Sequence, residues 1–185
     1  LSIGLNAELI EEELREAGDR PEATHLAGAI HGEVQRLKTI TEGYLQYARL
    51  PKPDRSQFAL SGLIEEMMVF LAGELTESEV TWSVDADDKG VRVEADAAQL
   101  RTALLNVARN AVEAMRKTSR PKRLDIALKT VASQRAEIWV TDTGPGIASD
   151  LADQIFEPFV TSKDSGTGLG LALTREIIHS HGGEI

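Results

Sequence analysis

Residues 142–147 read Asp-Thr-Gly-Pro-Gly-Ile, residues 156–159 read Phe-Glu-Pro-Phe, and residues 166–171 read Gly-Thr-Gly-Leu-Gly-Leu. Glycine lets a backbone come close to a flat base or a phosphate where a Cβ would clash. A glycine-rich turn that opens a helix also offers free N–H groups and a positive dipole end to phosphates. Blocks of this kind in this order predict an ATP site.

A helix predicted from about Ala97 to Met115 supplies a fourth block. Asn106, Asn110 and Glu113 follow i, i+4, i+7 spacing, which places them on one face of that helix. Its apolar residues form a different stripe: Leu100, Leu104, Val107, Ala108, Ala111 and Met115. An asparagine carbonyl is a neutral oxygen ligand suited to Mg²⁺, which takes its other ligands from phosphates and water. Asn110 is therefore the candidate metal ligand, and a solvated polar stripe is the alternative.

Asp142 ends a predicted strand that carries Ile138 and Val140. This position predicts a buried carboxylate that accepts a hydrogen bond from an adenine amino group. Gly144 and Gly146 then let the backbone approach the ring. A simple turn-forming aspartate is the alternative interpretation.

The segment from Ala148 to Ser165 is predicted to be a mobile cover over the nucleotide. Phe156, Phe159, Thr161 and Lys163 lie in it, and the threonine and lysine are placed to reach phosphate oxygens. For Lys163 an ordinary surface charge is an equally good interpretation.

Composition excludes several classes of protein. The net charge of −10 and the pI near 4.9 repel nucleic-acid phosphates, so neither DNA nor RNA is expected as a ligand. The chain has no cysteine, which excludes disulfides, zinc-thiolate sites and thiol catalysis. No apolar run approaches the roughly 20 residues that span a bilayer, so a soluble segment without direct membrane contact is expected.

The N-terminal part, 1–50, is predicted to be a helical hairpin with its turn at 18–21. In its second helix an apolar seam with a/d spacing is interrupted by the polar Glu33 and consists of Leu26, Ile30, Leu37, Ile40, Tyr44 and Tyr47. Two helices cannot bury such a seam alone, so we expect a homodimer with a four-helix bundle. The alternative is a hairpin packed on its own C-terminal domain.

Residues 51–57 are predicted to be a linker because Pro51 and Pro53 cannot continue a helix. The second domain, 58–185, should begin with a helix capped by Ser61. Its apolar stripe is Ile64, Met67, Met68, Leu71 and Leu75. Alternating residues predict strands around 80–84, 91–95, 124–128 and 138–140, and the last helix should run from about Gly170 to His181. The expected fold class is α+β: the hairpin, then an α/β sandwich with a mixed sheet covered by helices on one face.

The blocks N-x-x-x-N-A-x-E-A, D-T-G-P-G-I, F-E-P-F and G-T-G-L-G-L resemble the N, G1, F and G2 boxes of bacterial sensor histidine kinases, whose ATP-binding fold also occurs in gyrase, HSP90 and MutL. The ending Y-A-R-L-P-K-P resembles that of their dimerisation and phosphotransfer hairpin. E-V-Q-R-L-K-T-I and the short lid are similar to the nitrogen-regulation-like branch.

The resemblance implies roles for particular residues. Asn110 would bind Mg²⁺ and Asp142 adenine, while Asn106 stands where the related ATPases place a catalytic glutamate, which favours phosphotransfer over hydrolysis. The implied catalytic residues are Asn106 and Asn110. The implied nucleotide-binding residues are Asn110, Glu113, Asp142, Gly144, Gly146, Ile147, Phe156, Phe159, Thr161, Lys163, Gly166, Thr167, Gly168, Leu169 and Gly170.

One family motif has no counterpart in this sequence. Family members carry H-E-x-R-N-P-L on the first hairpin helix, and none of the four histidines, His25, His31, His179 and His181, stands in such a string. Two expectations stay open: the phosphoacceptor histidine lies upstream of Leu1, or the parent protein lacks one. The last strand of the second domain is also expected to be missing.

The function implied by the resemblance is that of a cytoplasmic kinase core. It would bind ATP or ADP with Mg²⁺, transfer the γ-phosphoryl to a hairpin histidine and then to an aspartate of a response regulator, docked near Leu14 to Ile30. A histidine-less ATP-binding scaffold and a gyrase- or MutL-like ATPase are the alternatives. Membrane attachment of the parent, the stimulus and phosphatase activity are left open.

Overall fold

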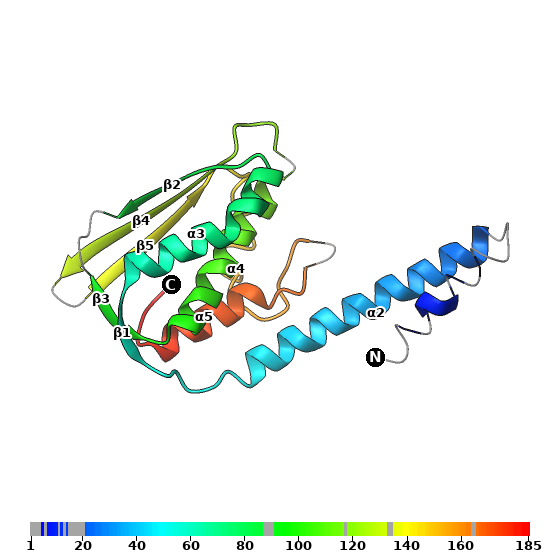
Figure 1. Cartoon of the computed structure of the whole chain (residues 1–185), viewed down its shortest axis with the longest axis horizontal. Helices are drawn as coiled ribbons and strands as arrows, with labels where there is room; N and C mark the ends of the chain where they lie inside the picture. The colour runs from blue at the N-terminus through cyan, green and yellow to red at the C-terminus, as the bar shows by residue number, and fades with distance from the viewer. Residues whose placement is uncertain are drawn as a thin grey trace. The chain divides into compact units, whose positions relative to one another are not determined.

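The structure, a computed structural model, describes residues 5, 7–10, 12, 14, 21–86, 91–116, 118–132, 135–163 and 166–185. The chain forms two compact units (Figure 1). The first consists of Leu1–Arg49 and Thr161–Thr167, and the second of Leu50–Val160 and Gly168–Ile185. The segment 51–57, predicted to be a linker, thus lies in the second unit.

The first unit contains the long helix α2, Pro21–Ala48. Pro21 suits its first turn, where an N–H has no intrahelical partner. Ile30, Leu37 and Tyr44, spaced by seven residues, are each about half exposed, at 53%, 55% and 49%. These members of the predicted apolar seam are therefore exposed within one copy of the chain, whereas Ile40 and Tyr47 are partly buried. The described residues among 5–14 are helical. Of the predicted turn at 18–21, Pro21 is the first residue of α2, and residues 18–20 lie outside the described residues.

In its described residues, the second unit contains three helices and two small sheets. Its elements in chain order are β1 Ser56–Ala59, α3 Leu60–Glu77, β2 Thr81–Ala86, β3 Arg92–Ala95, α4 Ala97–Met115, β4 Arg123–Ala132, β5 Arg135–Asp142 and α5 Gly170–Ser180. One sheet pairs β1 with β3 antiparallel. The other has the order β2-β4-β5, with β2 parallel and β5 antiparallel to β4. The predicted mixed sheet is confirmed.

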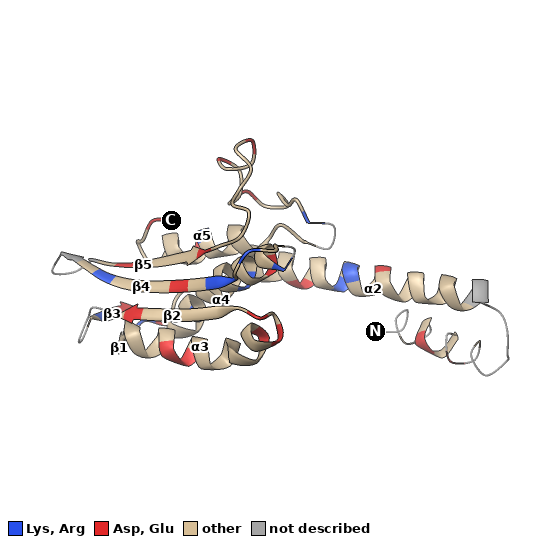
Figure 2. Ribbon diagram, turned by 90° about the horizontal axis from the view of Figure 1, so that it is seen from above, with Lys and Arg blue, Asp and Glu red and all other residues tan. Residues whose placement is uncertain are grey.

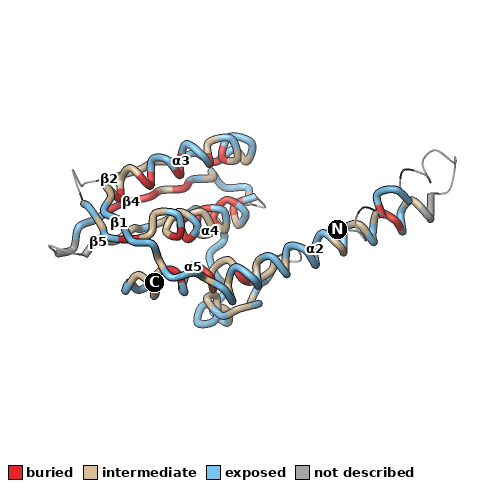
Figure 3. Tube along the Cα trace, turned by 60° about the horizontal axis from the view of Figure 1, so that its bottom comes forward, coloured by how far each residue is buried: buried red, intermediate tan, exposed pale blue. Residues whose placement is uncertain are grey.

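The core lies between the three-stranded sheet and the helices on one of its faces (Figures 1 and 2). α3 packs on β2, α4 packs on β4 and β5, and α5 packs on α4. Alternate residues of β4 face this core, so Leu124, Ile126 and Leu128 are almost fully buried. The helices bury one side and expose the other (Figure 3), as the apolar stripes of α3 and α4 predict.

The opposite face of the sheet carries polar side chains. Ser83 donates a hydrogen bond of 2.6 Å to Asp125, and Arg123 also donates to this carboxylate. The bond from Ser83 is the main cause that lowers the pKa of Asp125. Lys129 lies over the ring of Trp139, 5.2 Å from its centroid. This face is therefore solvated, in keeping with one-sided helix cover.

The start of α3 differs from the prediction. The helix begins at Leu60, after the extended residue Ala59, and no side chain caps it, so Ser61 as the N-cap is wrong. The physical reason is the short strand β1, which runs directly into the helix. The carbonyl of Val91, beside β3, accepts the Leu60 N–H at 3.0 Å and takes the place of a capping side chain.

None of the helices in the described part of the chain has the length and the apolar character that crossing a membrane requires.

Candidate functional site

Helix α4 presents the predicted polar face. Asn106 and Asn110 are partly buried and Glu113 is exposed, whereas Leu104, Ala108 and their apolar neighbours are buried. The Asn106 amide donates a hydrogen bond of 3.1 Å to the Gly170 carbonyl. This bond ties the middle of α4 to the first residue of α5. The polar face of α4 and the Gly-Thr-Gly-Leu-Gly-Leu block therefore lie together.

Asp96 fixes the beginning of α4. Its Oδ1 accepts the N–H groups of Ala98 and Gln99, both at 3.0 Å. The bond from Gln99 is the largest of the causes that lower the pKa of Asp96, with smaller contributions from the N–H groups of Asp54 and Ala98. A capping carboxylate offsets the free N–H groups and the helix dipole at this end.

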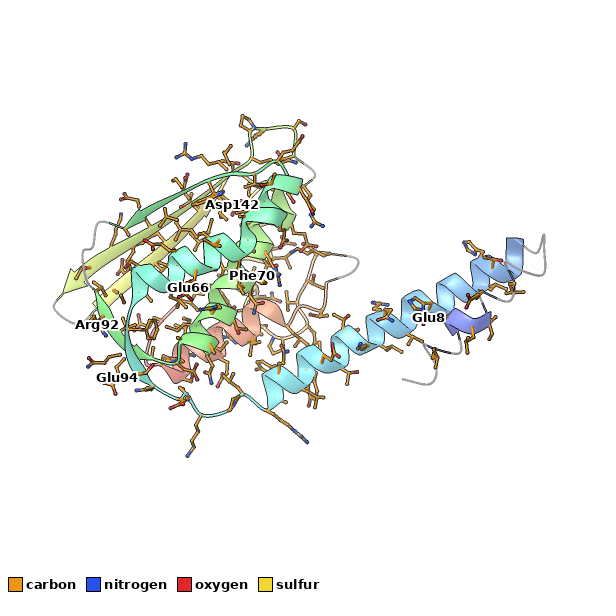
Figure 4. The ribbon with its side chains drawn as sticks, in the orientation of Figure 1. Glu8, Glu66, Phe70, Arg92, Glu94 and Asp142 are labelled. Carbon is orange, nitrogen blue, oxygen red and sulfur yellow. The ribbon has the colours of Figure 1, made fainter. Side chains whose placement is uncertain are left out.

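The turn after β5 brings Asp142 beside the C-terminal half of α4 (Figure 4). Its Oδ1 accepts the Gly144 N–H at 2.7 Å, and a Cβ on Gly144 would lie 2.7 Å from that oxygen and 3.3 Å from the Ala114 Cβ. A side chain at position 144 would therefore force the Asp142 carboxylate to shift. Asp142 is exposed, so the expectation of a buried carboxylate is wrong. It is the last residue of β5, which is an edge strand of the sheet that the described residues form and pairs there with β4 alone.

Thr143 holds this turn against the sheet. Its hydroxyl donates to the Pro121 carbonyl at 2.7 Å and accepts the Arg123 N–H at 2.9 Å. Sequence reasoning did not single out Thr143, because both partners are backbone groups about twenty residues earlier. Ile147, further along the turn, is 60% exposed, and Gly146 has a φ of +80° that favours glycine.

Phe159 and Gly168 close the base of the predicted cover. The Phe159 N–H donates to the Gly168 carbonyl at 3.1 Å, and both residues have positive φ, +67° and +66°. A Cβ on Gly168 would lie 2.5 Å from the backbone carbon of Phe159. Only glycine fits, and the tight contact brings the two ends of segment 160–167 together.

The remaining part of the Phe-Glu-Pro-Phe block is fastened to α5. Phe156 is partly buried, and Glu157 accepts two hydrogen bonds of 3.1 Å from the guanidinium of Arg175. Both bonds end on the same carboxylate oxygen, Oε1, and are charge-assisted, so they hold this block beside α5. Sequence reasoning missed this pair because its members are eighteen residues apart.

The first residues of α5 form the predicted glycine-rich helix start. Gly170 is held by the Asn106 amide and by the buried Thr174 hydroxyl, which donates to its carbonyl at 2.9 Å. Leu169 precedes the helix and is buried, and no side chain caps this end. In contrast to the N-cap residue of α4, that of α5 makes no side-chain capping bond to the first turn, and a helix end of this kind can receive an anionic group.

Thr161, Lys163, Gly166 and Thr167 belong to the first unit. Within it, the Lys163 N–H donates to the Thr161 hydroxyl at 3.1 Å, and a Cβ on Gly166 would lie 2.5 Å from the same oxygen. A side chain at position 166 would therefore force the Thr161 side chain to move. The residues that the structure does bring together are those of α4, of the turn after β5 and of the start of α5.

The sequence is similar to that of several known proteins. Residues 95–185 match the family described as "Histidine kinase-, DNA gyrase B-, and HSP90-like ATPase". The chain is 30% identical over 172 residues to the signal transduction histidine-protein kinase AtoS of Escherichia coli (strain K12). The matched region is 93% of this chain and 28% of AtoS.

Solved structures agree. The catalytic domain of the histidine kinase ThkA is 31% identical, with a TM-score of 0.62, 69% of this chain and 82% of that chain covered. The structure of ThkA in complex with the response regulator TrrA has a TM-score of 0.70 and is 26% identical. The match covers 97% of this chain and 52% of that chain. The structure of full-length ShkA in complex with AMPPNP has a TM-score of 0.73 and is 25% identical. The match covers 97% of this chain and 37% of that chain.

The chain therefore belongs to the sensor histidine kinase family, and its second unit has the ATP-binding fold of that family. It spans between 25% and 35% of the length of curated relatives such as AtoS.

Proposed function

We propose that this chain is the kinase core of a two-component sensor. In this proposal the second unit binds ATP with Mg²⁺, and the γ-phosphoryl passes to a histidine of the parent protein's helical hairpin. The phosphoryl then passes to an aspartate of a response regulator. The observation that carries the proposal is the uncapped, glycine-built start of α5, hydrogen-bonded to Asn106 of α4.

Binding of the nucleotide is supported from both ends. The exposed Asp142 carboxylate lies beside a turn in which Gly144 keeps Cβ atoms away from an approaching base. The first turn of α5 offers N–H groups to phosphate oxygens, which carry the opposite charge. ShkA, the full-length relative, was solved in complex with AMPPNP, which supports the same class of ligand for this chain.

The residues present also fit Mg²⁺. Among the described residues, no cluster of three or more His, Asp or Glu side chains is placed to hold a metal ion. Mg²⁺ normally keeps few protein ligands and takes the rest from phosphates and water, so the Asn110 carbonyl is a sufficient protein ligand. When bound, the ion would offset negative charge on the phosphates.

The protein groups mainly position and stabilise charge in such a transfer. An imidazole nitrogen attacks the γ-phosphorus, the N–P bond forms as the bond to the β-phosphate oxygen breaks, and ADP leaves with that electron pair. The uncapped end of α5 offsets the charge on the phosphates. Asn106 cannot take a proton from water as a glutamate would, and its amide is held by Gly170, which favours transfer to a side chain over hydrolysis.

Two partners belong to the proposal. The exposed seam of α2 supports a homodimer that buries the hairpins against each other. The structure of ThkA in complex with TrrA supports a response regulator as the second partner. Docking near Leu14 to Ile30 stays a prediction, and residues 15–20 of that surface lie outside the described residues.

The test is phosphorylation of the full-length parent protein with γ-labelled MgATP. We expect label that is labile to acid and stable to alkali, as a phosphohistidine is, and we expect Asn110→Ala to abolish it. Arg109→Ala is the matched control. Arg109 precedes Asn110 but is exposed and bonded to Glu74 on α3 at 3.2 Å, so this variant should keep its label.

The other outcomes separate the alternatives. ATP binding without label would contradict the kinase and favour a scaffold, which the missing H-E-x-R-N-P-L string permits. Steady ATP hydrolysis without a phosphoprotein would instead favour a gyrase- or MutL-like ATPase.

A further inference from the structure

The segment after α2 is hydrogen-bonded to the second unit at three points. The buried side chain of Gln99, on α4, donates to the Pro51 carbonyl at 3.0 Å. The Asp54 N–H donates to Oδ2 of Asp96 at 3.0 Å. We call residues 51–55 with these contacts the linker clamp. It makes the segment a part of the second unit, in agreement with the unit boundary between Arg49 and Leu50.

The third point joins the linker clamp to α5. Arg55 donates from Nη2 to the Ser180 carbonyl at 2.8 Å. Beside it, the Asp96 N–H donates to Nε2 of His181 at 3.0 Å, so the neutral ring carries its proton on Nδ1 and gives it to the Ile177 carbonyl at 2.8 Å. The clamp therefore engages the beginning of α4 and the end of α5, the two helices that build the nucleotide site.

The chemistry of the segment explains why side chains hold it. Pro51 and Pro53 have no N–H, so this stretch cannot form a continuous strand ladder. Gln99 is 8% exposed, and its Oε1 has no hydrogen-bond partner within the described part of the chain. An unpaired buried carbonyl costs free energy. The amide of Gln99 offsets part of this cost with the hydrogen bond that it donates to the Pro51 carbonyl.

We propose that Arg55, Asp96 and Gln99 are positioning residues that clamp the linker and place the pivot of the second unit between Arg49 and Leu50. The inference rests on the proposed function, because it concerns how the nucleotide site reaches the phosphoacceptor. The proline-rich segment then moves as a rigid extension of α4 and α5, so the nucleotide site turns as one body with residues 51–55 about the end of the hairpin.

The clamp is tested by distances between nitroxide labels, measured by double electron–electron resonance. The chain has no cysteine, so introduced cysteines are unique labelling positions. One pair combines Lys52→Cys with Glu94→Cys, on β3 (Figure 4), and both positions are exposed. The second pair combines Gln46→Cys, on α2, with Glu94→Cys. An excess of unlabelled chain removes distances between copies.

We expect a narrow distance distribution for the Lys52 pair and a broad one for the Gln46 pair. Equal widths would overturn the proposal: two broad distributions would place the pivot within the linker, and two narrow ones would mean that no pivot lies between Arg49 and Leu50. Asp96→Asn should broaden the Lys52 pair while the helix stays capped. An asparagine keeps one acceptor oxygen for the cap but loses the acceptor for the Asp54 N–H.

Arg55→Gln and Gln99→Met test the other two points, and both should broaden the Lys52 pair. Arg92→Gln is the matched control for Arg55→Gln, because Arg92 is also exposed and donates to a backbone carbonyl, that of Gln57 at 3.1 Å. It should leave the distribution narrow. If none of the three clamp variants broadened it, other contacts would hold the linker and the proposal would be wrong.

Activity supplies an independent readout. In the full-length parent protein, Arg55→Gln should lower the rate of phosphohistidine formation about tenfold, since loss of positioning acts on the transfer step. Its ATP affinity and melting temperature should match those of Arg92→Gln. Unchanged transfer would refute the positioning role. A parent protein that forms no phosphohistidine would refute the proposed function and leave the distance result standing.

Discussion

Gly168 meets two constraints that other residues cannot meet together. Its φ is +66°, and a Cβ would lie within 2.7 Å of three backbone atoms of Phe159 and Val160. Gly182 is the matched control, since its φ is +78° but nothing lies within 4 Å of the Cβ position. Gly182→Ala should cost about 1–2 kcal/mol of unfolding free energy from the backbone alone.

Gly168→Ala should lower the unfolding free energy further and should also weaken binding of a fluorescent ATP analogue, because the contact with Phe159 must open. Denaturation and nucleotide titration of both variants measure this. Equal stability losses and unchanged nucleotide affinity for Gly168→Ala would show that the base of the cover does not depend on close packing.

Asp96 gives a pH dependence with a definite sign. Its pKa is lowered in the folded chain, mainly by the Gln99 N–H, from an unfolded value of about 3.9. The ionised carboxylate therefore stabilises the fold above that value, and this stabilisation is lost as the pH falls through the folded pKa. Below about pH 4 the unfolding free energy should fall more steeply for the unsubstituted chain than for Asp96→Asn. Parallel acid profiles would contradict this assignment.

At the scale of elements, the two sides of α3 differ in burial. Ile64 is 0% exposed and Val69 is 77% exposed. Ile64→Ala should cost about 2–5 kcal/mol because it leaves a cavity beneath the sheet. Val69→Ala should stay within about 0.5 kcal/mol. Urea denaturation followed by tryptophan fluorescence is suitable, because Trp82 and Trp139 are the two tryptophans of the chain and both lie in the second unit.

Helices were more predictable than the short sheet. The span of α4 and the end of α5 follow from apolar periodicity and from Gly182, which are local signals. β1 has four residues, too few for an alternating pattern, and exists because β3 pairs with it across thirty-odd intervening residues. The prediction that Ser61 caps α3 is wrong for the same reason, because the group that replaces the cap, the Val91 carbonyl, is also distant in sequence.

The same limit applies to the site. The glycine blocks and the Asn106 face identify it because each is a local pattern. The bond from Asn106 to Gly170, the Glu157–Arg175 pair and the linker clamp join residues 18 to 125 positions apart. No spacing rule within one sequence indicates such pairs. Exposure of Asp142 likewise depends on its place at the end of an edge strand, which only the assembled sheet defines.

At the scale of the whole molecule, the seam of α2 predicts self-association. Ile30, Leu37 and Tyr44 recur every seven residues and are half exposed in one copy. A second copy would bury them by knobs-into-holes packing of two hairpins. Sedimentation equilibrium of the chain should therefore show a reversible dimer.

Leu37→Glu should dissociate this dimer, because burying a carboxylate in the bundle seam costs far more than its exposure in the monomer. Gln35→Glu is the matched control: it adds the same charge at an exposed polar position two residues away, on another side of α2, and should leave the dimer intact. Tryptophan fluorescence should show an unchanged second unit in both variants, since neither substitution lies within it. If both variants associated like the unsubstituted chain, the seam would not be the dimer interface. The hairpin would then have to bury it against another surface.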